Sequence, residues 1–185
     1  QKQQALLSQG YTLNVAKNGL AAAAQNFDRD DHATPSYVVY LNKIENTTAL
    51  TTLTPVLQNA DGSVTPVPHS AVTTVEQVPG STITAQTIEG YTPTQSQITI
   101  PTPVPTSENF VNGKFIGTNI NVIYTANEGN GTVVIATNQG SKTVTGIDGK
   151  TGQTVNIPTP SVDGYTPNRA MLTGVVNPDG SITVT

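Results

Sequence analysis

Side chains able to do acid–base or nucleophilic chemistry are few in this sequence. The 185 residues contain no cysteine, so there is no thiolate nucleophile, thiolate metal site or disulfide. The two histidines, His32 and His69, lie in different polar segments, and no serine stands in a nucleophile-elbow pattern. A Ser-His-Asp triad assembles in space, so the sequence alone leaves one open, against solvated loop histidines as the alternative. We expect a non-enzymatic protein that requires no cofactor.

One acidic cluster has the composition of a cation site. Asp28, Asp30 and Asp31 stand close together, and closely spaced carboxylates suit a hard cation such as calcium. An EF-hand loop beginning at Asp28 would need glycine at its sixth position and glutamate at its twelfth, which are Ala33 and Val39 here. Two interpretations follow: a structural calcium site of another kind, or a solvated acidic loop.

A tyrosine recurs in one tripeptide. Gly-Tyr-Thr occurs three times, at Tyr11, Tyr91 and Tyr165, and each copy is followed by a strongly β-forming run. This recurrence predicts three related units. The expected units are residues 1–48, 49–126 and 127–185. The three rings are the candidate ligand-binding residues, because an aromatic ring can stack on the apolar face of a sugar. The alternative is that each ring covers the core of its own unit, since folding requirements recur in every repeat.

The composition indicates which elements must position these residues. The chain has 31 threonines and 20 valines, which favour strands, and 16 asparagines, 16 glycines and 13 prolines, which favour turns. We therefore expect many short strands rather than a helical bundle. The net charge is -4 with only eight lysines and arginines, which argues against nucleic-acid binding. No apolar run approaches 18 residues, which argues against membrane insertion.

Individual elements can be placed along the chain. The expected strands lie at 51–57, 63–67, 119–124, 132–136 and 142–147, with turns at 59–62 and 177–180. Helices are expected at 1–9 and 20–26, and no strand pair precedes the first of them, so the first unit reads as truncated at its N-terminus. Residues 45–48 and 127–131 read as linkers. The proline tracts at 101–105 and 158–160 read as stiff connectors or edge strands, or as ligands for a proline-binding domain.

Several stretches together resemble a known family. They are Leu-Ser-Gln-Gly-Tyr-Thr-Leu at 7–13, Asn-Phe-Asp-Arg-Asp-Asp at 26–31, Tyr-Val-Val-Tyr-Leu-Asn at 37–42, and the longer segments 88–124 and 162–184. These stretches are similar to the mucus-binding repeats, including the MucBP-type module, of surface adhesins from lactobacilli and related Gram-positive bacteria. Residues 7–42 resemble the back half of the N-terminal module, and 162–184 the later part of a MucBP-like module.

The resemblance implies a fold and a function. The implied fold is α+β and β-rich, with tandem ubiquitin-like β-grasp modules in an elongated arrangement. The implied protein is secreted, anchored to the cell wall at the bacterial surface, and binds mucin glycoproteins through their glycans, weakly per repeat and strongly through many repeats. An immunoglobulin bound at a strand edge or helix is an alternative ligand. A spacer that binds neither is the third hypothesis.

Overall fold

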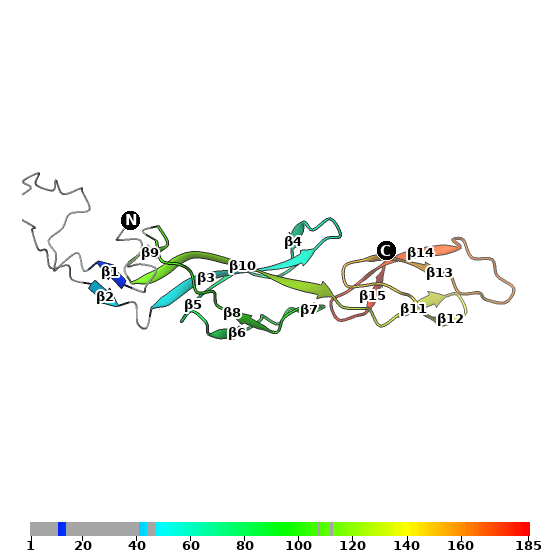
Figure 1. Cartoon of the computed structure of the whole chain (residues 1–185). Coiled ribbons are helices and arrows are strands. Elements are labelled where there is room, and N and C mark those ends of the chain that lie inside the picture. The colour runs from blue at the N-terminus through cyan, green and yellow to red at the C-terminus, as the bar shows by residue number, and fades with distance from the viewer. Residues whose placement is uncertain (1–10, 14–40, 44–46, 107, 112) are drawn as a thin grey trace, which may run out of the picture. The chain divides into compact units, whose positions relative to one another are not determined.

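The computed structural model describes residues 11–13, 41–43, 47–106, 108–111 and 113–185. Within these residues every regular element is a strand (Figure 1). The strands are β1 (Tyr11–Leu13), β2 (Leu41–Lys43), β3 (Thr48–Gln58), β4 (Val64–Pro66), β5 (Thr73–Gln77), β6 (Thr82–Thr84), β7 (Tyr91–Pro93), β8 (Gln97–Thr99), β9 (Phe110–Val111), β10 (Lys114–Ala126), β11 (Thr132–Thr137), β12 (Gly140–Thr145), β13 (Thr154–Pro158), β14 (Met171–Val176) and β15 (Ile182–Val184).

The expected α+β, β-grasp fold is wrong for the described part of the chain. This part is all-β, divides into several sheets, and holds no helix to lie across a sheet face. The Gly-Tyr-Thr segments near residues 88–92 and 162–167 begin with tight turns. Gly90 and Gly164 occupy the left-handed region there, with φ of 80° and 79°, which a right-handed helix cannot accommodate. The helices expected at 1–9 and 20–26 lie outside the described residues.

The chain divides into two compact units, and the long strands β3 and β10 contribute residues to both. Unit 1 comprises residues 1–52, 74–81 and 99–118, and unit 2 comprises 53–73, 82–98 and 119–185. The largest sheet has the strand order β4-β3-β10-β7, with β5 also paired to β3 and β9 to β10. The boundaries expected from the sequence, at 48 and 126, stay a prediction.

Unit 1 has a small apolar core and one polar cluster. Phe110 and Phe115 meet edge to face with ring centroids 5.0 Å apart, and Phe115 is buried. On the surface, the Glu76 carboxylate lies 2.8 Å from the Lys114 ammonium and accepts a hydrogen bond of 2.6 Å from the Thr48 hydroxyl. The lysine and the hydroxyl hold the pKa of Glu76 below its usual value.

Unit 2 contains the hairpins that the sequence predicted. Strands β11 and β12 pair antiparallel, with Thr132 opposite Thr145, and β14 lies between β13 and β15. Alternate residues of these strands point inward, as the pleat requires, and form one core. Its buried members are Val133, Ile135, Ile147, Val155, Ile157 and Val176. The expected turn at 177–180 joins β14 to β15.

Two hairpin turns share the same sequence pattern and the same hydrogen bonds. In Asn59–Ser63 and Asn177–Ser181, the asparagine N–H donates to the serine carbonyl over 2.8 Å, and the asparagine carboxamide donates to the serine hydroxyl over 2.9 Å. The aspartate two residues before each serine accepts from both its amide and its hydroxyl. These bonds lower the pKa of Asp61 and of Asp179, with the serine hydroxyl as the main cause.

A second correspondence supports the expected repetition. Gly80 donates to the Ile100 carbonyl over 2.8 Å, and Ile100 donates back to Ser81 over 2.8 Å. Gly152 makes the same 2.8 Å bond to Val176, which donates back to Gln153 over 3.1 Å. Ile100 and Val176 are both fully buried. The stretches 80–100 and 152–176 therefore share the same hydrogen bonds at their ends.

Candidate ligand-binding surface

Tyr91 lies in a turn that packs against residues far along the chain. Its amide donates to the Ile88 carbonyl over 3.1 Å, and Gly90 forms the corner with a positive φ. The tyrosine is only 7% exposed. Its hydroxyl lies 3.7 Å from the point where a side-chain carbon on Gly152 would stand. A ring covered in this way cannot stack on a sugar, which removes Tyr91 from the candidate ligand-binding residues.

Gly90 sits against a neighbouring turn so closely that only glycine fits. A Cβ at this position would lie 2.7 Å from the Pro178 Cα and 2.7 Å from the Thr151 methyl carbon. Contacts between carbon atoms are normally about 3.5–4.0 Å. The Gly-Tyr corner is therefore part of a joint, in which residues 90–92 pack on the turns at 151–152 and 178.

Residues 127–131, which read as a linker in the sequence, are hydrogen-bonded throughout this joint. The Asn127 amide donates to Gly90 over 2.8 Å, and its carbonyl accepts from the Thr151 amide over 2.9 Å. The Asn127 carboxamide oxygen also accepts from the Thr92 hydroxyl over 2.6 Å. Gly129 and Asn130 continue the pattern by donating to Gly149 and Gly180 over 2.8 Å each. The segment is a fixed connection rather than a flexible one.

Tyr165 has the same local turn but a different environment. Its amide donates to the Val162 carbonyl over 3.0 Å, and Gly164 takes a φ of 79°, as Gly90 does in the earlier copy. No atom lies within 4 Å of the Cβ position at Gly164. The tyrosine is 54% exposed, and its hydroxyl accepts a hydrogen bond of 3.1 Å from the Gln139 carboxamide. Tyr165 is exposed and its hydroxyl is bonded to an amide, so its candidacy as a ligand-binding residue stays a prediction.

The remaining candidates are Tyr11 and the three aspartates of the acidic cluster. The side chain of Tyr11 and the residues Asp28, Asp30 and Asp31 lie outside what the structure describes, so a tyrosine contact and a calcium site there stay predictions. In the described residues, no group of three or more His, Asp or Glu side chains is placed to hold a metal ion. His69, the histidine that the structure describes, is exposed in a turn after β4, with a φ of 59°.

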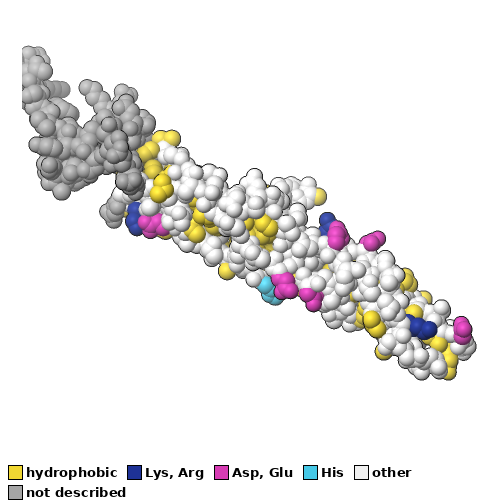
Figure 2. All heavy atoms as spheres, turned by 90° about the horizontal axis from the view of Figure 1, so that it is seen from below, with side chains coloured by type: hydrophobic (Ala, Val, Ile, Leu, Met, Phe, Trp, Pro, Cys, Tyr) yellow, Lys and Arg dark blue, Asp and Glu magenta, His cyan; other side chains and the backbone are white. Residues whose placement is uncertain are grey.

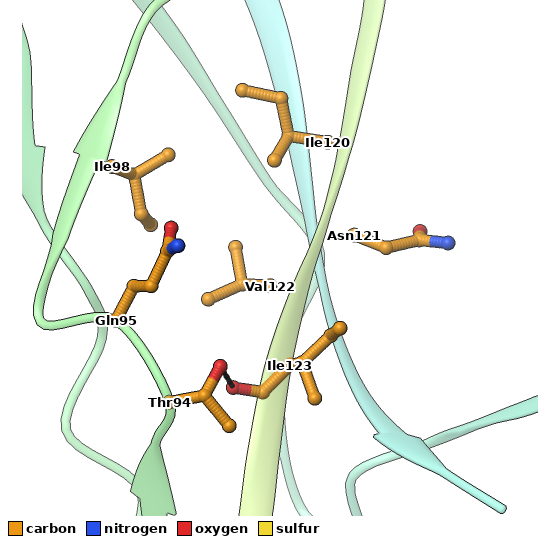
Figure 3. Close-up of a pocket in the computed structure, with 7 residues that line it drawn as sticks. All are labelled: Thr94, Gln95, Ile98, Ile120, Asn121, Val122 and Ile123. Carbon is orange, nitrogen blue, oxygen red and sulfur yellow. Dashed lines mark hydrogen bonds between the residues drawn. The ribbon is translucent and has the colours of Figure 1, made fainter.

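A shallow cleft lies between the β7–β8 connection and β10. Its volume is about 140 Å³, whereas small-molecule sites are typically about 300–1,000 Å³. Figure 3 shows Gln95, Ile98 and Val122 around one space, with Asn121 directed to the other side of β10. The Thr94 hydroxyl, also at the rim, donates to the Ile123 carbonyl over 3.1 Å. The cleft is large enough for a methyl-sized group but does not enclose a sugar ring.

Tyr124 shows how an aromatic residue serves the fold instead of a ligand. It is nearly completely buried, and its hydroxyl donates to the Gln86 carbonyl over 2.6 Å. Burial raises the pKa of this phenol. The ring therefore closes the core beneath β10 and is not offered to solvent.

The surface of the described residues is polar but carries few charges. On the face that Figure 2 shows, Lys, Arg, Asp and Glu side chains are sparse, and white atoms make up most of the surface. The described residues include no helix that is long and apolar enough to cross a membrane. Such a surface offers hydroxyl and carboxamide groups for hydrogen bonding without a dominant electrostatic field.

No protein-family model, curated protein or solved structure matches the chain. The similarity to mucus-binding repeats therefore stays a prediction from the sequence. Sequence reasoning found the tyrosines by their repetition but missed what surrounds each one. Gln139 lies 26 positions from Tyr165, and nothing in the local sequence pairs the two residues.

Proposed function

We propose that this chain is a non-enzymatic repeat of a secreted bacterial surface adhesin, and that it binds mucin-type glycans weakly. The observation that carries the proposal is the exposed ring of Tyr165, held at its hydroxyl by the Gln139 carboxamide. Sugar recognition needs an apolar face for the C–H groups and polar partners for the hydroxyl rim. The Tyr165 ring supplies the apolar face, and the Gln139 carboxamide supplies a polar partner. The sparsely charged surface suits a neutral ligand.

The experiment measures binding of the whole chain to immobilised mucin at physiological salt, before and after periodate oxidation of the glycans. The proposal predicts binding that disappears on oxidation and that falls at least about fivefold in Tyr165→Ala, the loss of one stacking contact of about 1 kcal/mol. Tyr91→Phe is the matched control, because its ring is buried in the joint and should leave binding unchanged. Mucin binding that survives oxidation, or that ignores Tyr165→Ala, would contradict the proposal.

A parallel surface of immunoglobulin G tests the alternative protein ligand. Immunoglobulin binding without mucin binding would favour a protein-recognition module and direct attention to strand edges. Binding that appears on neither surface would favour the spacer hypothesis. The spacer has its own supporting observation, which is the hydrogen-bonded joint at Asn127: fixed joints suit a protein that must hold other domains in place.

A further inference from the structure

The three Gly-Tyr-Thr copies differ in whether a strand lies beside them. In the first copy, β1 pairs antiparallel with β2, and Tyr11 stands opposite Lys43. In the second, β7 pairs antiparallel with the end of β10, and Tyr91 stands opposite Ala126. Both pairings cover the three residues that begin at the tyrosine. The third copy, at Tyr165–Pro167, has the same turn but forms no strand pair with any described residue.

The second copy shows which backbone groups the neighbouring strand uses. Thr94 donates to the Ile123 carbonyl over 2.8 Å, and Asn127 donates to the Gly90 carbonyl over 2.8 Å. Hydrogen-bonded pairs alternate with non-bonded pairs along an antiparallel ladder. Thr92 and Thr125 stand opposite each other between those two bonds, so they form a hydrogen-bonded pair. Pro93 stands at a non-bonded position, where the backbone nitrogen faces away from the partner strand, so the missing N–H of proline costs no hydrogen bond.

The corresponding groups of the third copy face solvent and make no hydrogen bond to any described residue. By the alignment of Gly90 with Gly164, they are the Gly164 carbonyl, the Thr166 amide and carbonyl, and the Asn168 amide. All three residues are exposed. The turn that precedes them is already formed, with matching φ values and matching tyrosine amide bonds. The edge is thus preorganised in the shape that accepts a strand in the second copy.

We propose that the Gly164–Asn168 edge binds an extended strand from another polypeptide, antiparallel, in the register that β10 takes beside β7. The occupant is a segment with the pattern of residues 123–127, Ile-Tyr-Thr-Ala-Asn, as found at the closing strand of such a repeat. In this register its threonine stands opposite Thr166 and its alanine opposite Tyr165. The proposal concerns backbone groups and does not rest on glycan binding by the Tyr165 ring.

A synthetic peptide with the sequence of residues 119–128, bearing terminal lysines for solubility, is the probe. Added to the whole chain, it should shift the amide resonances of Thr166 and Asn168 and slow exchange of the Thr166 amide at least tenfold. The Thr92 amide, already paired within the chain, serves as the internal reference and should not change. Absence of any shift at millimolar peptide would overturn the proposal.

Two N-methylated peptides make the register test independent of any protein variant. Methylation of the nitrogen at the position of Thr125 removes a donor that faces Thr166, and should weaken binding at least tenfold. Methylation one residue earlier, at the position of Tyr124, modifies a nitrogen that faces away and should leave binding within about twofold. Equal effects of the two methyl groups would refute the proposed register.

The protein-side test replaces Thr166, whose amide is the central donor of the edge. Thr166→Pro removes that donor and should abolish peptide binding, while Thr166→Ala keeps the amide and should retain it. Peptide that binds Thr166→Pro as well as it binds the unmodified chain must occupy another edge, for example by displacing β10, and would overturn the proposal. Should Thr166→Pro fail to fold, the methylated peptides decide alone.

Discussion

Gly90→Ala is the substitution that tests the joint most directly, and Gly164→Ala is its matched control. Both glycines occupy the corner of a Gly-Tyr-Thr turn, with φ of 80° and 79°. An alanine at either site carries the cost of a left-handed backbone, about 1–2 kcal/mol. The smaller entropy of the unfolded alanine chain offsets about 0.4–1 kcal/mol of that cost. The control therefore isolates the backbone term, which we expect to total about 1 kcal/mol.

The two sites share their backbone conformation but differ in what the new Cβ would meet. At Gly164 no atom lies within 4 Å, whereas at Gly90 the Pro178 Cα and the Thr151 methyl carbon both lie at 2.7 Å. A backbone Cα cannot rotate away as a side chain can, so the turn at 178 must move as a whole. Overpacking of this kind costs about 1–3 kcal/mol. Gly90→Ala should therefore be about 2 kcal/mol less stable than Gly164→Ala.

The assay compares the thermal midpoints of the two variants and the hydrogen exchange of the joint. A difference of about 2 kcal/mol corresponds to about 4–8 °C in a chain of this size. Hydrogen exchange shows which residues lose stability. In Gly90→Ala the amides of Asn127 and Thr151, which bond across the joint, should exchange faster. In Gly164→Ala the same two amides should keep their protection.

The refuting result is equal destabilisation by the two alanines. It would mean that the contact of Gly90 with Pro178 and Thr151 contributes nothing, and that the joint is open in solution. The stability of a double variant tests separately whether the contact with the Thr151 methyl group causes the loss. Thr151→Ser removes the methyl group that the Gly90→Ala Cβ would meet, so in the double variant part of the loss should be recovered.

Three further predictions concern the cores and the hairpin turns. Thr51 is fully buried and its hydroxyl has no hydrogen-bond partner, so Thr51→Val should raise the stability of unit 1 by about 1–2 kcal/mol, whereas Thr51→Ser, which keeps the hydroxyl, should not. Ile157 is fully buried in the unit 2 core, so Ile157→Ala should cost about 2–5 kcal/mol in denaturant unfolding. The pKa values of Asp61 and Asp179 are lowered in the folded state, chiefly by the serine hydroxyl two residues on, so their stabilisation is present at neutral pH and is lost as the pH falls through the folded-state values, below 3.8. The thermal midpoint of the D61N/D179N variant should therefore fall less between about pH 5 and pH 2 than that of the unmodified chain.

The strands and turns were predictable because their signals are local. The run at 132–136 and the Asp-Gly turns at 61–62 and 179–180 encode short-range geometry, and the structure has a strand and turns there. The β-grasp helix was not encoded in this way; it came from a resemblance. Between residues 82 and 98, and between 154 and 171, glycine and proline leave no uninterrupted run longer than eight residues.

The candidate site was predictable only in part, because burial depends on residues far away. Tyr91 and Tyr165 share their tripeptide and their turn, yet one is buried and the other exposed. The difference arises from the joint, where the turn at 151–152 packs on Tyr91. The shared tripeptide accompanies the same φ at Gly90 and Gly164, but it does not specify which residues pack on the tyrosine.

The joint also bears on how a repeat protein could gain avidity. The sequence Asn-Glu-Gly-Asn-Gly at 127–131 has the composition of a flexible linker, and such a linker would let neighbouring repeats reorient freely. Here its amides are held by Gly90, Gly149 and Gly180. When binding surfaces are held at fixed spacing, multivalent binding is strong only for ligands whose own spacing matches, and is lost for the others. If the proposed glycan binding is correct, Gly90→Ala should therefore broaden the range of mucin preparations that tandem repeats bind, while leaving the affinity of a single repeat for a short glycan unchanged.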